Sequence, residues 1–255
     1  MKFRIASLVP SVTELVVALG LRPHLVARTG FCIHPAQALR DVPKVGGTKD
    51  VNVAKLRRLA PTHVIVNVDE NRLETVKEVR TFVPHVIVTH PCAPEDNHVL
   101  IDQLAEAFGS VAGVAARAQA LHDRLAVELA ATTPEGRPAQ RVLYLIWRDP
   151  WMTVARDTYI SRMLARVNWH TAPAQEGGPR GAARYPALKG DEPWLAGIDR
   201  VLLSSEPYRF TEAHFSEAAA LAPGARVQLV DGELPSWYGP RAIDGLRYLR
   251  ELAAP

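Results

Sequence analysis

The sequence predicts an α/β protein with two Rossmann-like lobes on parallel sheets, one long α-helix joining them, and a ligand cleft between them. Three observations predict this fold. Continuous apolar runs, typical of buried parallel strands, alternate with helical patterns over residues 1–110. A second alternation of the same kind occupies residues 134–255, and residues 111–133 between them have a helical pattern without proline. We therefore expect an N-terminal lobe, a linking helix and a C-terminal lobe with these boundaries.

The first alternating series contains four apolar runs with the length and composition of strands. We expect these strands at Lys2–Leu8, Leu25–Thr29, Thr62–Val68 and His85–His90. The first strand leads into a helix, in which Ser11 and Glu14 have capping-box spacing and Gly20 provides the stop. Further helical patterns cover Asn52–Leu59, Asn71–Phe82 and Glu95–Phe108. A parallel sheet covered on both faces follows from this order.

The linking segment is expected to be a single helix over Val111–Ala131 of about 20 residues and roughly 30 Å. Its apolar residues recur at helical spacing, and they are Val114, Ala118, Leu121, Leu125 and Leu129. The second series repeats the α/β pattern, with strands expected at Arg141–Trp147, Asp199–Ser205 and Ala225–Asp231. Helices are expected at Thr158–Asn168, Thr211–Leu221 and Arg241–Ala253, and the longest loop at Gln175–Pro186.

Charge and hydropathy exclude two partner classes. The net charge is +3, and no block of Lys and Arg indicates a nucleic-acid partner. No apolar stretch reaches the roughly 18 residues of a membrane span, so we expect no membrane insertion. Pro10 and Glu14 interrupt the apolar residues that a secretory signal would need near the N-terminus. We therefore expect a cytoplasmic protein, with a periplasmic one as the alternative if a leader was removed.

The loops after the strands indicate where a ligand would bind, because ligands of open α/β sheets bind at the carboxyl ends of the strands. All five Trp and all six Tyr follow residue 140, and several lie in or beside these loops, where they could wall a flat ligand. The arginines there could bind carboxylate or phosphate groups, or lie at the surface in solvent. Arg148, Arg156, Arg209 and Arg241 share these loops. The ligand candidates from the loops are Asn71, His90, Trp147, Arg148, Trp151, Tyr159, Trp237, Tyr238 and Arg241.

The two cysteines of the chain each have a histidine two residues away, in Cys32/His34 and His90/Cys92. Thiolate and imidazole suit zinc, copper or cobalt, so these four residues could form a metal site. Two other interpretations remain open, namely two buried unreactive thiols, or ligand contact by one of the histidines. A disulfide is disfavoured in a cytosolic protein.

Catalytic motifs are absent for the common reaction classes. The sequence has no G-x-S-x-G elbow, no G-x-x-x-x-G-K-[ST] phosphate loop and no H-E-x-x-H. Asp69 and Glu70 could form an acid pair with His90, although carboxylates at helix starts more commonly interact with the helix dipole. We therefore expect a protein that is not an enzyme.

Several stretches resemble the helical-backbone (class III, TroA-like) solute-binding proteins. They are "RIASLVPSVTELVVALGL", "KVGGTKDVNVAKLRRLAPTHVIVNVDEN", the long helical pattern and "SWYGPR". The resemblance covers both lobes and is closest to the cobalamin-binding and helical-backbone metal-receptor branch. It implies a ligand between the lobes, contacted by Phe31 or His34 from the first lobe. From the second lobe it implies Trp151 and Trp237, with Arg241 near a polar edge of the ligand.

The resemblance also implies an ABC permease as partner, although the acidic docking residues of transport members are not found. The position of the first-lobe docking acid falls near Ala54, and the second-lobe docking acid is missing from "SWYGPR". In addition, Thr48 stands where the cobalamin pocket of the family has an aromatic residue. From these observations we expect non-catalytic binding of a small-molecule metal chelate, with a cobalamin or other corrinoid first, and His34 or His90 as axial ligand. The alternatives are a bare transition metal on Cys32, His34, His90 and Cys92, or an enzyme of corrinoid or tetrapyrrole metabolism.

Overall fold

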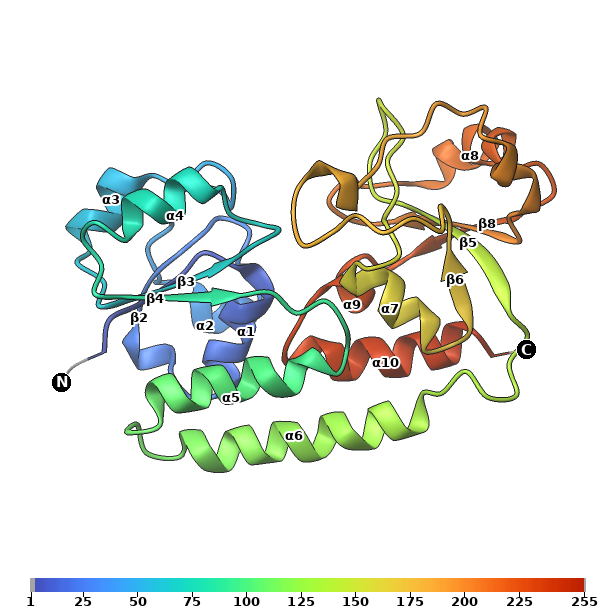
Figure 1. Cartoon of the computed structure of the whole chain (residues 1–255). Coiled ribbons are helices and arrows are strands. Elements are labelled where there is room, and N and C mark those ends of the chain that lie inside the picture. The colour runs from blue at the N-terminus through green and yellow to red at the C-terminus, as the bar shows by residue number, and fades with distance from the viewer. Residues whose placement is uncertain (1–2, 255) are drawn as a thin grey trace. The chain divides into compact units, whose positions relative to one another are not determined.

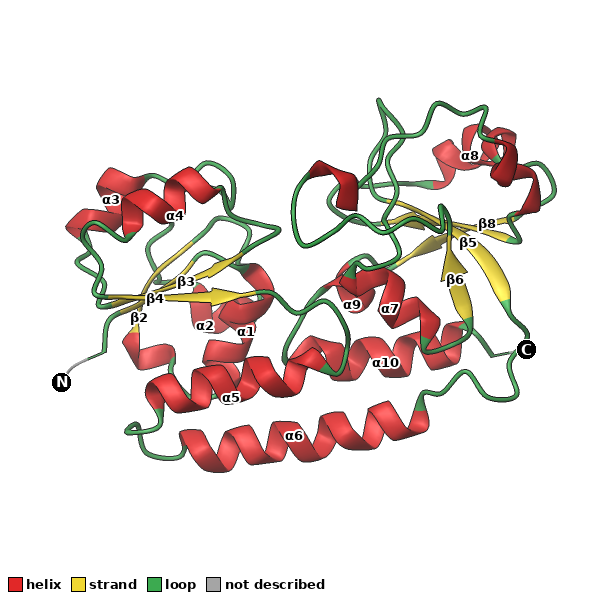
Figure 2. Ribbon diagram, viewed as in Figure 1, coloured by secondary structure: helices red, strands yellow, loops and turns green. Residues whose placement is uncertain are grey.

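The computed structural model describes residues 3–254, and within them it contains two four-stranded parallel sheets (Figures 1 and 2). The chain divides into two compact units. Unit 1 comprises residues 1–91, 96–125 and 238–240, and unit 2 comprises residues 92–95, 126–237 and 241–255. The α/β fold with two parallel sheets that the sequence predicts is therefore confirmed.

The sheet of unit 1 has the strand order β2-β1-β3-β4. Its strands are β1 (Ile5–Ser7), β2 (Leu25–Arg28), β3 (His63–Asn67) and β4 (His85–Thr89). Ile5 lies opposite His63, and His63 lies opposite His85, so these three strands start together. All four expected strands are present, and only the expected start at Lys2 lies outside the described residues. Their carboxyl ends form one edge of the sheet.

Helices cover both faces of this sheet (Figure 2). They are α1 (Pro10–Ala18), α2 (Ala36–Leu39), α3 (Val53–Arg58), α4 (Leu73–Val79) and α5 (Asp96–Phe108), with a short 3-10 helix η1 at Arg22–His24. Alternate strand residues such as Ala6 and Val64 pack in one core with Leu56 of α3 and Val79 of α4. Buried apolar side chains at every second strand position thus fix which face each helix covers.

The expected capping box of α1 is wrong. Pro10 occupies the first turn, Val9 is the N-cap residue, and no side chain caps the helix. Ser11 is therefore inside the helix, where its buried hydroxyl finds no hydrogen-bond partner among the described residues. The expected stop is correct, since Gly20 adopts φ +79 just beyond the helix, in the left-handed region that glycine enters easily.

The expected long helix is α6 (Val114–Ala131), and the division between the two units falls after Leu125. It starts later than Val111 because Gly113, with φ +84, precedes its first turn. Val114, Ala118, Leu121 and Leu125 are buried, as their spacing predicts. No helix in residues 3–254 combines the length and apolar character needed to cross a membrane.

The sheet of unit 2 has the order β6-β5-β7-β8. Its strands are β5 (Gln140–Leu145), β6 (Trp169–Thr171), β7 (Arg200–Ser204) and β8 (Arg226–Val230). Three of them were expected, although β5 ends at Leu145 and not at Trp147. The three residues of β6 are too few for an apolar pattern, so this edge strand could not be predicted from the sequence.

The helices of unit 2 are α7 (Tyr159–Ala165), α8 (Phe215–Leu221), α9 (Glu233–Ser236) and α10 (Pro240–Leu252), where Pro240 itself belongs to unit 1. Three short 3-10 helices accompany them, η2 (Ala182–Arg184), η3 (Pro193–Gly197) and η4 (Glu212–His214). The single helix expected over Thr211–Leu221 is therefore η4 followed by α8, with Thr211 and His214 forming a capping box. Thr158 caps α7 through its hydroxyl, which accepts from the backbone N–H of Ser161.

Candidate functional site

The loop after β2 presents an aromatic ring to solvent. The buried guanidinium of Arg28 donates hydrogen bonds to the backbone carbonyls of Leu39 (3.2 Å), Thr29 (3.2 Å) and Cys32 (3.0 Å). This fixes the loop with the Cys32 side chain inward and the neighbouring Phe31 outward, 62% exposed. Gly47 adjoins the ring, because a Cβ there would lie 3.2 Å from Cε2 of Phe31. Phe31 is therefore held at the carboxyl edge of the first sheet with its ring available.

Cys32 is a buried structural thiol. The hydroxyl of Thr13 donates to its sulfur at 3.1 Å, and the hydroxyl of Thr29 lies at the same distance. Burial raises the pKa of the Cys32 thiol, although these hydrogen bonds oppose the shift. A protonated, enclosed sulfur is neither a nucleophile nor a metal ligand.

The four residues of the predicted metal site belong to both units, three to unit 1 and Cys92 to unit 2. Among residues 3–254, no three His, Cys, Asp or Glu side chains gather so that they could hold a metal ion. Cys32 is buried, whereas Cys92 is half-buried in unit 2, where Nη2 of Arg184 lies 3.7 Å from its sulfur. Neither cysteine forms a disulfide. The interpretation of Cys32 as a buried unreactive thiol is the one that the structure supports.

Asn71 has a structural role. Its side-chain amide donates to the carbonyls of Leu8 (3.2 Å) and Thr48 (2.9 Å), and its Oδ1 accepts from the backbone N–H of Asn67 (2.8 Å). The residue is only 6% exposed. The polar atoms of Asn71 therefore hold three backbone segments together, and ligand contact by this residue stays a prediction.

Two histidines lie at the same edge of unit 1. His34 is half-buried in the loop after β2. His90 follows β4, and its Nε2 lies 3.5 Å from Oδ2 of Asp69, so the expected pairing of these two residues is present. Lys49 donates to the backbone carbonyl of Asp69 at 2.6 Å. Burial lowers the pKa of Lys49, while the neighbouring Glu70 and Asp69 act in the opposite direction.

Two tryptophans line the loop after β5 in unit 2. Trp147 is 41% exposed, and its ring meets Tyr208 edge to face at 5.6 Å. Trp151 is half-buried and stacks on Phe210, with ring centroids 5.8 Å apart and 3° between the ring planes. Trp147 therefore has the more accessible ring, and Trp151 has one face already covered.

Three other predicted ligand residues are buried. Tyr159, Trp237 and Tyr238 are 4%, 6% and 6% exposed. The indole Nε1 of Trp237 donates to Oε1 of Glu206 at 2.7 Å, and the guanidinium of Arg241 lies 5.0 Å from the Trp237 ring. The expected stacking of Trp237 and Tyr238 on a ligand stays a prediction, and each side chain has little exposed surface in this structure.

Glu206 is a further residue at this edge, and it was not among the residues predicted from the sequence. Its carboxylate accepts from the Trp237 indole and from the hydroxyl of Ser236 at 3.1 Å. Burial raises the pKa of Glu206, although these hydrogen bonds lower it in part, and nearby Glu233 and Asp231 raise it further. A buried carboxylate that fixes an indole can be found only from the fold.

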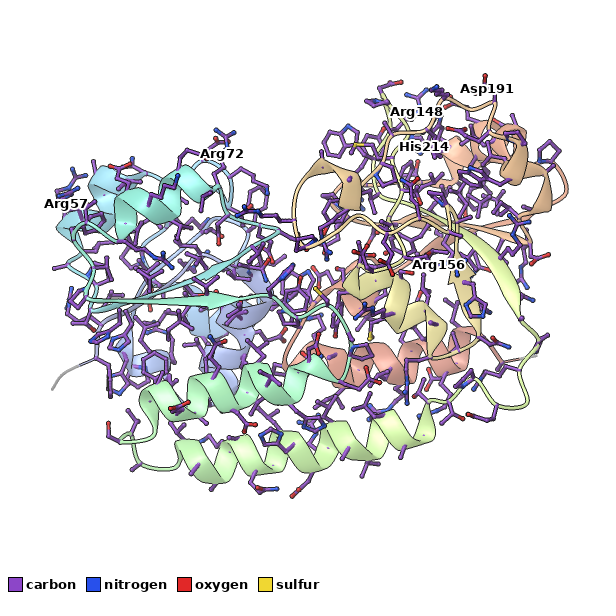
Figure 3. All side chains as sticks on the ribbon, viewed as in Figure 1. Arg57, Arg72, Arg148, Arg156, Asp191 and His214 are labelled. Carbon is purple, nitrogen blue, oxygen red and sulfur yellow. The ribbon has the colours of Figure 1, made fainter. Side chains whose placement is uncertain are left out.

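The arginines of the unit 2 loops fall into two groups. Arg148 pairs with Asp149 (3.0 Å) and Glu217 (2.7 Å), and Arg241 pairs with Glu233 (3.0 Å). Arg156 donates to the carbonyl of Thr171 at 2.9 Å (Arg148 and Arg156 are labelled in Figure 3). Arg209 makes no side-chain hydrogen bond, ion pair or ring contact with any described residue. The two arginines predicted to contact a ligand are thus held by carboxylates.

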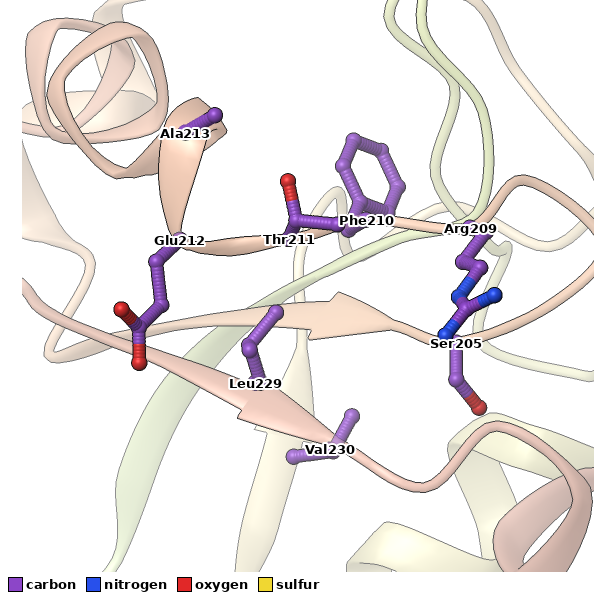
Figure 4. A pocket seen from close by; sticks show the side chains of 8 residues that line it. All are labelled: Ser205, Arg209, Phe210, Thr211, Glu212, Ala213, Leu229 and Val230. Atoms are coloured by element: carbon purple, nitrogen blue, oxygen red, sulfur yellow. The ribbon is translucent and has the colours of Figure 1, made fainter.

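Arg209 lies at a cavity of about 520 Å³ in unit 2, next to the carboxyl ends of β7 and β8 (Figure 4). Its lining residues are Ser205, Arg209, Phe210, Thr211, Glu212, Ala213, Leu229 and Val230. A second hollow of about 500 Å³ lies in unit 1. It is polar and is lined by Lys49, Asp50, Val51, Asn52, Val53, Arg72, Glu74, Thr75 and Glu78.

The family model for periplasmic binding proteins matches residues 5–187, which is more than half of the chain. The chain belongs to the periplasmic binding protein family. This confirms the resemblance to solute-binding proteins noted from the sequence. The family is named for the periplasm, so it supports the alternative location and gives no support to the expected cytoplasmic one.

Two curated relatives match. One is the vitamin B12-binding protein of Photorhabdus laumondii, 26% identical over 165 residues, which are 64% of this chain and 58% of that protein. The other is the uncharacterized ABC transporter substrate-binding lipoprotein YvrC of Bacillus subtilis, 24% identical over 99% of this chain and 80% of its own length. The match to the first relative thus spans little more than half of that protein.

Solved structures share the fold. The periplasmic vitamin B12-binding protein BtuF of Vibrio cholerae has a TM-score of 0.78 at 19% identity, covering 97% of this chain and 96% of its own. The periplasmic heme-binding protein HutB of Vibrio cholerae has a TM-score of 0.78 at 20% identity, with all of both chains covered. At these identities the likeness is one of fold.

Proposed function

We propose that this chain is the substrate-binding protein of an ABC transporter and that it binds a metal chelate of the tetrapyrrole type without altering it. Cobalamin is the first candidate, and heme is the second. The observation that supports this most is the pairing of full-length fold likeness to vitamin B12- and heme-binding proteins with exposed rings at the strand ends. A bare metal ion is disfavoured, because no described residues form a ligand set for one.

The side chains at the two carboxyl edges suit such a ligand. Phe31 and Trp147 are exposed aromatic rings that can pack against the faces and edges of a macrocycle. His34 and His90 bring imidazoles to the same edge of unit 1, and imidazole is a good ligand for cobalt or iron. We propose one of these two histidines as the axial ligand of the bound metal.

A titration with hydroxocobalamin and, separately, with hemin tests the proposal. We expect saturable binding at micromolar concentration or below, with a shift of the visible bands when a protein imidazole coordinates the metal. His34→Ala or His90→Ala should abolish the spectral shift, and the other substitution should leave it in place. No saturable binding of either compound at tens of micromolar would contradict the proposal.

Ring contact is tested by Phe31→Ala and Trp147→Ala, each expected to weaken binding roughly tenfold, since a buried aromatic contact contributes on the order of 1–2 kcal/mol. Val127→Ala is the matched control, because Val127 is an exposed apolar residue on α6 that follows no strand.

Mass spectrometry of the ligand after incubation should return its mass unchanged, whereas a new mass would favour an enzyme of corrinoid or tetrapyrrole metabolism.

A further inference from the structure

Four arginines lie in the loops at the carboxyl edge of unit 2, and their surroundings separate them. Arg148 and Arg241 face carboxylates at 2.7–3.0 Å and are neutralised by them. Arg156 is engaged by the carbonyl of Thr171. Arg209 is exposed and unpaired within residues 3–254. A guanidinium without a partner at a ligand-binding edge has its whole donor fork available for a ligand.

The surroundings of Arg209 define the chemistry of that ligand group. Ser205 lies at the same end of the cavity (Figure 4). Its Oγ accepts from the backbone N–H of Gly232 at 2.8 Å, which leaves the hydroxyl hydrogen to be donated elsewhere. A guanidinium beside a hydroxyl donor suits an oxyanion, because both present hydrogen atoms to it.

The floor of the cavity is apolar. Phe210 and Val230 are buried residues of its lining, and Leu229, also in the lining, keeps 40% of its surface exposed. Leu229 is uncovered because α8, which packs on this face of the sheet, spans only Phe215–Leu221. The aliphatic surface therefore suits a short hydrocarbon arm that leads to the oxyanion.

The opposite end of the cavity restricts the ligand further. Glu212 lies there, at the start of η4 and away from Arg209 (Figure 4). A carboxylate disfavours a second anion in the same hollow, so one charged arm fits and two do not.

We infer that Arg209, with Ser205, is the specificity-determining residue of unit 2, and that it binds a single oxyanion on a short aliphatic arm of the chelate. This inference rests on the proposed function and assigns that site the ligand class of anionic metal chelates. The oxyanion is a carboxylate of a porphyrin propionate or the phosphodiester of a complete cobalamin. Arg148 and Arg241, which the sequence predicted as ligand contacts, form ion pairs within unit 2, so their guanidinium groups are not available to the oxyanion as that of Arg209 is.

The test compares three probes on wild type and on Arg209→Gln, which keeps the length of the side chain and removes its charge. The probes are hydroxocobalamin, which has one phosphodiester, cobinamide, which lacks it, and hemin, which has propionates. We expect Arg209→Gln to weaken binding of the oxyanion-bearing ligand roughly 10- to 100-fold, as loss of a hydrogen bond to a charged group does. Cobinamide binding, where wild type shows it, should be unchanged.

The matched control is Arg226→Gln. Arg226 is an exposed arginine at the first position of β8, at the end opposite the cavity, so this variant loses the same charge from the same unit away from the proposed site. Its affinity should equal that of wild type. Wild-type affinity should also fall with added salt, and Arg209→Gln should lose most of this dependence, since an exposed ionic contact is screened.

The outcomes separate the two proposals. If wild type binds a ligand and Arg209→Gln binds it equally well, the role of Arg209 is overturned and the proposed function stands. If Arg226→Gln loses as much affinity as Arg209→Gln, general charge accounts for the effect, and the role of Arg209 is again overturned. If wild type binds none of the three probes, both proposals fail. A loss confined to hemin identifies the carboxylate, and a loss confined to hydroxocobalamin identifies the phosphodiester.

Discussion

The amide of Asn71 links the ends of β1 and β3 and the turn at Thr48 through three hydrogen bonds. Replacing it by alanine leaves a buried N–H and two buried carbonyls without these partners. We expect Asn71→Ala to lower the free energy of unfolding by about 2–3 kcal/mol, measured by urea denaturation. Arg72→Ala is the control, because its ion pair with Asp50 is 59% and 80% exposed and should contribute less than about 1 kcal/mol. Equal effects of the two variants would contradict the structural role of Asn71.

The environments of the two cysteines predict different reactivities. Cys32 is fully buried, and burial raises the pKa of its thiol, whereas Cys92 is half-buried. A thiol reagent should therefore modify only Cys92 in the folded protein and both cysteines in denaturant, because the thiolate is the reactive form. Mass mapping of the labelled peptides identifies the site. Fast labelling of Cys32 under native conditions would show that the loop after β2 opens.

At the residue scale, the sequence predicted where polar and aromatic side chains follow strands, but it could not predict what each one contacts. Trp147 lies in the loop after β5, and Trp237 directly follows α9 beyond β8. Trp237 is buried and donates to Glu206, a residue distant in sequence, whereas Trp147 is exposed. Arg148 and Arg209 differ in the same way, because Glu217 forms an ion pair with Arg148 and not with Arg209.

At the scale of elements, apolar runs predicted strands well wherever a strand is buried on both faces. β3 is buried at every residue, and its bounds lie within the expected run. β6 was missed because three residues with a histidine in the middle have no such pattern. The capping box at Ser11 failed because Pro10 is better suited to the first turn of the helix.

A pair of histidines on adjacent strands makes the first sheet sensitive to acid. His63 of β3 is buried and stacks on His85 of β4, with centroids 4.5 Å apart and 19° between the ring planes. Burial lowers the pKa of His63, and the neighbouring His85 lowers it further. A histidine in the unfolded chain has a pKa of about 6.5, so the imidazole of His63 is protonated more readily in the unfolded chain than in the folded one.

The consequence is a loss of stability on acidification. The contribution of His63 is fully present above about pH 6.5 and is lost as the pH falls through that value toward the lowered pKa of the folded state. Urea denaturation of wild type at several values between pH 7.5 and pH 5 should show this decline. His63→Phe, which keeps a ring among Phe3 and Phe108, should flatten it. An identical pH profile for the variant would rule out His63 as the source.

At the scale of the whole molecule, the sequence predicted the two α/β series, because every lobe of this type must alternate buried strands with covering helices. The ligand did not follow from the fold, since vitamin B12- and heme-binding proteins both share it. Under the inference above, the ligand depends on a few side chains at the strand ends, and Arg209 is one whose exposed, unpaired state the sequence does not reveal.

Ligand binding should therefore be read from the stability of the whole chain. A ligand that binds only the folded state, at 100 times its dissociation constant, adds about 2.7 kcal/mol to the free energy of unfolding. For a chain of 255 residues this corresponds to a rise in Tm of about 5–10 °C. We expect that rise with hydroxocobalamin or hemin in a calorimetric scan, and none with cobalt(II) or iron(II) salts at equal concentration, because no described residues form a metal-ion site. Stabilisation by the bare ion to the same extent would show that the macrocycle contributes nothing, and the proposed ring contacts of Phe31 and Trp147 would have to be abandoned.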